Sequence, residues 1–228
     1  MDYDSLLKLV KNRRSIRKFK PEPIPDEYVD KIIEVARWAP SGANSQPWQF
    51  VVIKKEELRR KIFQIVSGGT EGVKKIELIR DEDIRFNWEG VGWDKAPAYI
   101  LVCGDGRLKD CFPLMPALSA GDAILESSLA SAFLYMMLAA NALGLGAQWV
   151  SAVSTPHLQL LLKKLLGIPK ELFIYDMMAV GYPDMVPPPR VVRDKKEIVH
   201  YNGYDQSKFP TDKQVREFVV KLRKSMPM

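Results

Sequence analysis

The sequence is poor in cysteine and histidine, with two of each among 228 residues. Cys103 and Cys111 cannot form a disulfide framework, and no further ligands follow them at the spacing of a zinc site. We therefore expect no bound metal and a reducing compartment, the cytoplasm. The N-terminal residues Met-Asp-Tyr-Asp-Ser are acidic and unlike a signal peptide, which favours the same location.

Concentrated charge is also lacking. The formal net charge is +6, but lysine and arginine are spread along the chain with aspartate and glutamate among them. A nucleic-acid-binding stripe would be more concentrated, so we expect no nucleic-acid partner. A diffuse positive charge indicates only that the protein attracts anions. Hydrophobic residues make up 46% of the chain, which is enough for a core and excludes a disordered protein.

Charge is entirely absent from Ser127 to Val153. An apolar run of this length could span a membrane. It contains several polar residues and the turn Gly144-Leu145-Gly146, and no basic cluster flanks it. A helix that is apolar on all sides is better explained as the buried centre of a globular protein or dimer, so we expect no membrane association.

Helices and strands alternate along the chain, which predicts an α+β layered fold. Helices are expected at residues 3–12, 55–66 and 156–166, and at about 121–143 and 212–224. Another helix should begin with Asp26 as its N-cap and end before Pro40. Expected buried strands cover residues 48–53, 98–103, 147–153 and 173–180. The length suits one domain over residues 1–228, with a variable excursion and loop at 67–120 and an extended tail at 182–205. Aromatic residues of the excursion could cap a substrate or anchor the loop to the core: Phe86, Trp88 and Trp93.

Arginine is clustered once, at Arg13, Arg14 and Arg17. Guanidinium groups are suited to bidentate capture of phosphate or of a carbonyl-rich ring, and Ser15 adds a hydroxyl donor. The alternative is an ordinary basic turn exposed to solvent. We name residues 13–17 the arginine motif.

A second group of short polar residues joins an expected helix to an expected strand at Pro40–Trp48. Such turns expose backbone N–H groups that bind anions and hydrogen-bonding rings. The alternative is an ordinary turn anchored by Trp48. The donors of this segment, which we name the turn motif, are Ser41, Gly42, Asn44, Ser45 and Gln46.

Taken in order, these motifs resemble the nitroreductase-like flavoprotein superfamily. The pattern is Arg-Arg-Ser-x-Arg-x-Phe followed by Ala-Pro-Ser-x-x-Asn-x-Gln-Pro-Trp. Residues 139–149 and 181–201 resemble the central helix with its turn and the C-terminal signature of the same superfamily. The match spans about residues 8–205 and fails mainly at 67–96 and 105–120. The resemblance implies a three-layer fold, with a mostly antiparallel central sheet flanked by helices, in an intertwined homodimer.

The resemblance also implies a binding site for FMN at the dimer interface. From one subunit, the phosphate, ribityl chain and pyrimidine edge would be held by Arg13, Arg14, Ser15 and Arg17. From the other subunit would come Pro40, Ser41, Gly42 and Asn44. The strand and turn beneath the flavin, with a backbone N–H near N5, would be Gln148, Trp149, Val150 and Ser151. Arg190 or Arg193 would return to the phosphate, and we favour Arg193.

The activity that the resemblance implies is hydride transfer from NAD(P)H through flavin N5 to a small electron-poor acceptor, by a ping-pong mechanism. The acceptor could be a nitroaromatic, a quinone or a halogenated phenol, and the segment 39–43 and the tail resemble the iodotyrosine dehalogenase branch. The flavin carries the chemistry, so no catalytic side chain is expected, and His157 and His200 are interpreted as structural. The alternative is a flavin-binding or flavin-degrading protein without nicotinamide turnover.

Overall fold

The computed structural model describes residues 2–86 and 92–225, and the chain divides into two compact units. The first, which we name the sheet unit, contains residues 1–70 and 92–185. The second, which we name the tail unit, contains residues 71–91 and 186–228. The expectation of a single domain therefore stays a prediction, and the two units are described separately.

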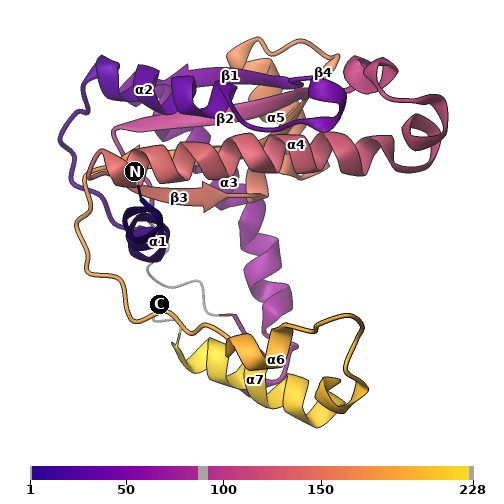
Figure 1. Cartoon of the computed structure of the whole chain (residues 1–228). Coiled ribbons are helices and arrows are strands. Elements are labelled where there is room, and N and C mark those ends of the chain that lie inside the picture. The colour runs from indigo at the N-terminus through magenta and orange to yellow at the C-terminus, as the bar shows by residue number, and fades with distance from the viewer. Residues whose placement is uncertain (1, 87–91, 226–228) are drawn as a thin grey trace. The chain divides into compact units, whose positions relative to one another are not determined.

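A four-stranded antiparallel sheet forms the centre of the sheet unit, in the order β1-β2-β4-β3 (Figure 1). The strands are β1 (Trp48–Ile53), β2 (Ala98–Asp105), β3 (Gly146–Val150) and β4 (Leu172–Gly181). The expected antiparallel α+β fold is thus confirmed. The central strands β2 and β4 are mostly apolar and buried along nearly their whole length, as expected for strands covered on both faces. β1 lies at the edge and is only partly buried, which corrects the expectation of a buried strand there.

Helices cover both faces of the sheet, so the expected three layers are confirmed (Figure 1). α2 (Asp26–Arg37) and α4 (Leu114–Ala142) lie over one face, while α5 (Pro156–Leu166) and the first part of α3 (Glu56–Glu77) lie over the other. The core on the α4 face joins side chains of α2, α4 and all four strands. The expected homodimer stays a prediction.

The apolar run between Ser127 and Val153 belongs mainly to α4. Among the described residues this is the one helix long and apolar enough to cross a membrane. Half of its most apolar stretch is buried within the protein. Leu129, Phe133 and Met136 are fully buried against the sheet. The packing is that of a core helix, as expected.

Several element boundaries differ from the expectation. α1 (Tyr3–Asn12) is as predicted, but Asp26 is the first residue of α2 and Pro25 is its N-cap. α4 begins at Leu114 and not near Gly121. Pro116 suggested a loop, but it lies in the first turn of the helix, where a proline interrupts no helical hydrogen bond. It ends close to the predicted stop, and Gly144 follows with a φ of 75°.

The excursion and the end of β3 also differ. α3 continues to Glu77, so helix replaces the first part of the expected irregular segment. Trp93 is buried and packs edge-on against Phe63 and Tyr99, at centroid distances of 4.9 and 5.0 Å, which supports anchoring to the core. Trp88 lies outside the described residues. β3 ends at Val150 and not at 153, because the chain turns into a short 3-10 helix (Ala152–Ser154).

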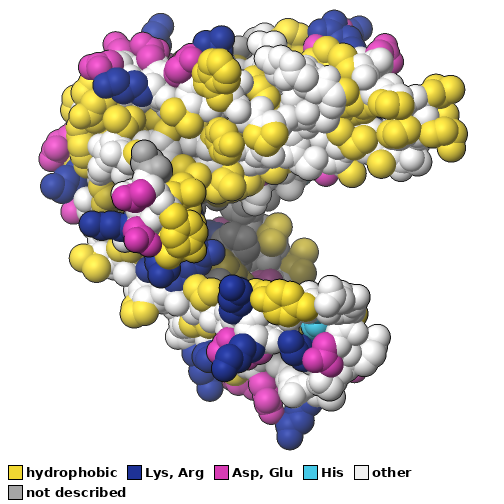
Figure 2. Space-filling view, viewed as in Figure 1, with side chains coloured by type: hydrophobic (Ala, Val, Ile, Leu, Met, Phe, Trp, Pro, Cys, Tyr) yellow, Lys and Arg dark blue, Asp and Glu magenta, His cyan; other side chains and the backbone are white. Residues whose placement is uncertain are grey.

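The tail unit contains α6 (Lys195–Ile198) and α7 (Asp212–Ser225), with a 3-10 helix at Glu82–Ile84. Arg216 pairs with Asp81 at 2.9 Å, and Arg223 lies over the ring of Phe86 at 5.1 Å. The expected extended tail is therefore interrupted by α6. On the face drawn in Figure 2, basic and acidic side chains are interspersed, in keeping with the mixed charge of the sequence.

Candidate functional site

The arginine motif lies alongside β3 in the sheet unit. The backbone N–H of Ile16 donates to the carbonyl of Ala147 at 3.0 Å, and Ser15 forms a parallel bridge with Ala147. The Asn141 side chain donates to the Leu9 carbonyl at 3.0 Å and so fixes α1 to the end of α4. The tertiary structure thus brings together two of the motifs that the sequence separates by more than one hundred residues.

This close approach depends on Gly146 at the start of β3. A Cβ placed on Gly146 would lie 2.6 Å from the Ile16 side chain, which is too short for a real contact. Ile16 itself is buried, so it has little room to move. Glycine at this position therefore allows the arginine motif to lie against the sheet.

Arg17 is a half-buried cation that lacks an anion. No ion pair is recorded for Arg14 or Arg17 within residues 2–86 and 92–225, whereas the Arg17 backbone N–H donates to the sulfur of Met185 at 3.2 Å. Burial lowers the pKa of the Arg17 guanidinium, because the charged form has lost part of its hydration. A bound anion would compensate this loss, so the position fits a phosphate or an electron-rich ring oxygen.

Gln148 presents a buried amide oxygen without a partner. The residue is 7% exposed, and its Oε1 accepts no hydrogen bond from any described group. Gln148 pairs with Ala179 in the sheet, and strand alternation directs its side chain away from the α4 face. Because an unsatisfied buried acceptor is costly, the oxygen suits a ligand that brings an N–H or O–H group.

The turn motif has a strained backbone. Ala43, Asn44 and Gln46 all have positive φ, at 48°, 53° and 45°, a region that residues other than glycine rarely adopt. The Gln46 N–H donates to Ser41 Oγ at 3.0 Å, which closes the turn. Ser45 Oγ is buried without a partner among the described residues. Strain of this kind is concentrated at functional sites and ligand clamps.

Gly42 fixes the turn motif to α4. Its N–H donates to Ser128 Oγ at 3.1 Å, and a Cβ at this position would lie 2.2 Å from Ile124. Helix α1, which directly precedes the arginine motif, is fixed near the other end of α4 by the hydrogen bond from Asn141 to Leu9. Ser128 and Asn141 are about 20 Å apart along the helix axis at 1.5 Å per residue. One chain therefore does not place these two motifs side by side.

The Trp149 side chain is held in the core of the sheet unit. Its ring stacks on Phe133 at a centroid distance of 4.0 Å, and its indole N–H donates to the buried carboxylate of Asp176. The Trp149 side chain is therefore engaged within the protein, and the role of the Trp149–Ser151 backbone beneath a flavin stays a prediction. Sequence reasoning missed Asp176, although one acidic residue within the apolar run 173–180 was a visible signal.

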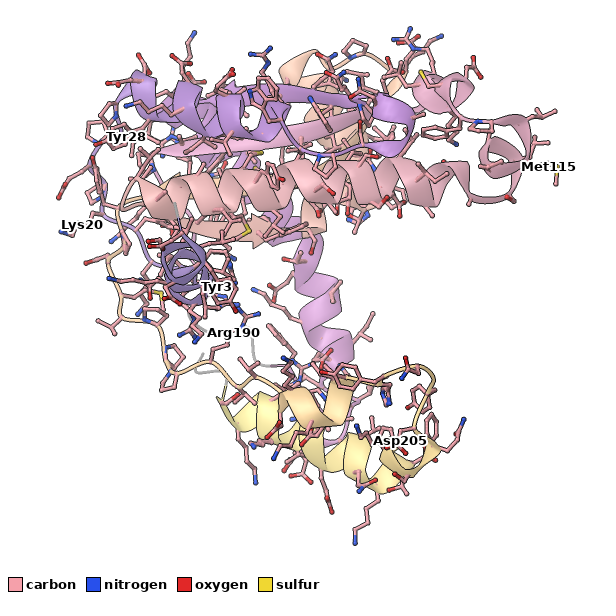
Figure 3. All side chains as sticks on the ribbon, in the orientation of Figure 1. Tyr3, Lys20, Tyr28, Met115, Arg190 and Asp205 are labelled. Atoms are coloured by element: carbon pink, nitrogen blue, oxygen red, sulfur yellow. The ribbon has the colours of Figure 1, made fainter. Side chains whose placement is uncertain are left out.

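Arg190 and Arg193 both belong to the tail unit, and Figure 3 labels Arg190 there. Arg193 lies 3.6 Å from Glu197 and over the ring of Phe218 at 5.8 Å. Both arginines are exposed. The preference for Arg193 as a phosphate ligand stays a prediction.

The histidine and cysteine side chains within residues 2–86 and 92–225 form no second site. His157 is exposed at the start of α5, and His200 stacks on Tyr204 at 4.2 Å in the tail unit. Burial raises the pKa of the Cys103 thiol to about 11, so this cysteine is unreactive near neutral pH. No group of three or more metal-ligating side chains occurs in the described part of the chain.

The chain is similar to known flavin-related proteins over most of its length. "Putative NADH dehydrogenase/NAD(P)H nitroreductase" of Methanothermobacter thermautotrophicus is 28% identical over 193 residues, 85% of each chain. Iodotyrosine deiodinase of Thermotoga neapolitana is 31% identical over 204 residues, covering 87% of this chain and 98% of that one. The crystal structure of oxidized iodotyrosine deiodinase bound to FMN and 3-iodo-L-tyrosine is 30% identical, with a TM-score of 0.69 over 87% of this chain and all of that chain.

The sequence model of the nitroreductase family matches residues 10–182. That range includes the arginine motif, the turn motif and all four strands of the sheet. The chain belongs to the nitroreductase family.

Proposed function

We propose that the protein is an FMN-dependent oxidoreductase that passes a hydride from NAD(P)H to an electron-poor acceptor. The observation that carries the proposal is that the arginine motif lies along β3, the same strand that carries the buried and unpartnered amide oxygen of Gln148. FMN offers a phosphate dianion to guanidinium groups, and hydroxyl and ring N–H groups to a buried acceptor. The residues present therefore fit this cofactor.

The proposed binding roles are those that the resemblance to the nitroreductase family implies. Arg13, Arg14, Ser15 and Arg17 hold the phosphate, the ribityl chain and the pyrimidine edge. Gln148 accepts a hydrogen bond, and the backbone of Trp149–Ser151 faces the ring. Arg193, or alternatively Arg190, is assigned to the phosphate as well.

A second copy of the chain supplies the turn motif in this proposal. Its Pro40, Ser41, Gly42 and Asn44 complete the site, since the two anchor points on α4 are about 20 Å apart within one chain. When bound, FMN would supply the redox chemistry, hydride transfer between NAD(P)H and the acceptor, and the residues named above would hold it. The protein binds and orients the reactants, and no catalytic acid or base is assigned.

Among acceptors, a halogenated phenol is the first to test. Two of the proteins similar to this chain at 30% identity or more are named iodotyrosine deiodinase. Nitroaromatics and quinones remain acceptors of the same kind, because a family does not fix the substrate of each member.

The first experiment is purification under native conditions. The protein should be a yellow dimer whose flavin is FMN, and the flavin should bleach anaerobically with NADH or NADPH. Reoxidation by 3-iodotyrosine, a nitroaromatic and a quinone then ranks the acceptors. A protein that neither carries nor binds FMN would refute the proposal. A flavin that neither donor reduces would leave a flavin-binding or flavin-degrading protein in its place.

A pair of neighbouring variants tests the cation assignment. Arg17→Ala should weaken FMN binding by about 10- to 100-fold, the effect of losing one hydrogen bond to a charged group. Lys18→Ala, at an exposed neighbouring position, should leave FMN affinity within about twofold. Equal affinities for the two variants, measured by fluorescence titration, would contradict the role of Arg17.

A further inference from the structure

Asp176 on β4 is the one buried carboxylate among the described residues, with 6% of its surface exposed. Its Oδ2 accepts a hydrogen bond from the Trp149 indole, and no cation pairs with it within the described ranges. Tyr175 is beside it on β4. Burial raises the pKa of the Tyr175 hydroxyl, and the charges of Asp176 and of Glu126 on α4 add to that rise. Burying a carboxylate without a cation lowers the stability of the folded state, so stability does not explain an aspartate at this position.

The position of Asp176 in the sheet is specific. Val150 pairs with Met177 at the end of β3, and one step further Ser151 and Asp176 would face each other, but the ladder stops there. The bond from Trp149 to Asp176 therefore ties β3 to β4 where the chain leaves the sheet. Trp149 is held from its other side by Phe133, whose ring lies at an interplanar angle of 28°. Together these contacts hold the Trp149 side chain, which directly precedes Val150 and Ser151.

We propose that Asp176 is a positioning residue, which through its hydrogen bond with Trp149 holds the Val150–Ser151 backbone against the flavin. This inference rests on the proposed function, since it requires a flavin at the end of β3. Trp149 connects Asp176 to the proposed flavin site, because its main chain is part of that site while its indole packs in the core.

The carboxyl group of Asp176 changes its protonation state at a pH that can be reached in experiments on the folded protein. Burial raises the pKa of Asp176 to about 6, and the hydrogen bond from Trp149 opposes part of that rise. Near pH 5 the group is therefore a neutral carboxyl, and near pH 7 it is a carboxylate that accepts a stronger hydrogen bond from the indole. The strength with which the end of β3 is held should vary over this interval.

The experiment follows two signals of the FMN-loaded protein between pH 5 and pH 7.5. The first is the indole N–H resonance of Trp149, assigned by its loss in Trp149→Phe. The second is the flavin midpoint potential, corrected for the ordinary pH dependence of free FMN. In the wild type both signals should titrate with a common midpoint near pH 6. In Asp176→Asn neither should, although the protein still binds FMN.

Two further variants keep the test decisive. Trp149→Phe retains the stacking on Phe133 but removes the donor, so it should abolish the same titration of the potential even if Asp176→Asn fails to fold. Glu126→Gln changes the other nearby acid and should leave both titrations in place. The indole resonance could titrate while the flavin potential has the same pH dependence in the wild type and in the variants. That result would overturn the positioning role and leave the proposed function intact. Absence of bound flavin in every protein would instead remove the proposed function, and this inference with it.

Discussion

Replacing Asp176 by asparagine should stabilise the protein, and the gain should grow with pH. Asparagine has nearly the same shape and keeps a carbonyl oxygen that can accept the hydrogen bond from Trp149, but it cannot ionise. The wild-type carboxyl group has a pKa of about 6 in the folded protein, against 3.8 for the unperturbed group. The folded state therefore binds the proton more tightly than the unfolded state.

The sign of the pH dependence follows from that difference. Protonation of Asp176 stabilises the fold, and the contribution is complete below pH 3.8 and lost as the pH rises to about 6. The full loss corresponds to about 3 kcal/mol at 1.36 kcal/mol per pKa unit. Between pH 5 and pH 8 the wild type should lose about 1.4 kcal/mol from this group, whereas the asparagine variant should lose none of it.

The assay is urea denaturation of wild type and Asp176→Asn at pH 5 and pH 8, at equal protein and FMN concentrations. Equal concentrations are required because ligand and partner binding shift apparent stability. Asp30→Asn, which removes an exposed carboxylate from α2, is the control and should show no comparable change between the two pH values. A stability difference between wild type and Asp176→Asn that stays constant or shrinks at pH 8 would refute the reasoning.

Three other predictions concern packing and reactivity. Gly146→Ala should destabilise the protein by about 1–3 kcal/mol through overpacking and weaken FMN binding in titrations, whereas Gly68→Ala, in open space on α3, should raise stability by about 0.5–1 kcal/mol. Trp93→Ala should cost about 3–5 kcal/mol in denaturation experiments, and a much smaller loss would show that Trp93 is not part of the core. A thiol reagent at pH 8 should modify Cys111 rapidly in the native protein and Cys103 only after denaturation; equal rates would contradict the burial of Cys103.

Local sequence features predicted much of the fold. β1 and α5 were expected within a residue of their observed limits, because an apolar β-rich run and a proline at the first turn of a helix are local signals. Boundaries were wrong where a local signal has two meanings. Pro116 suggested a loop but lies in the first turn of α4. The apolar residues up to Val153 suggested a longer strand, but the chain leaves β3 after Val150 and forms a short 3-10 helix.

The sequence by itself determined the order of the motifs and the kinds of group they offer: guanidinium groups, a turn of short polar residues and an apolar central helix. Only the tertiary structure decided which of these groups meet. It placed the arginine motif on β3, left the amide oxygen of Gln148 without a partner, and turned Trp149 into the core against Asp176. The physical reason is that periodicity and turn chemistry act over a few residues, whereas contacts across a sheet depend on the register between strands that are distant in sequence.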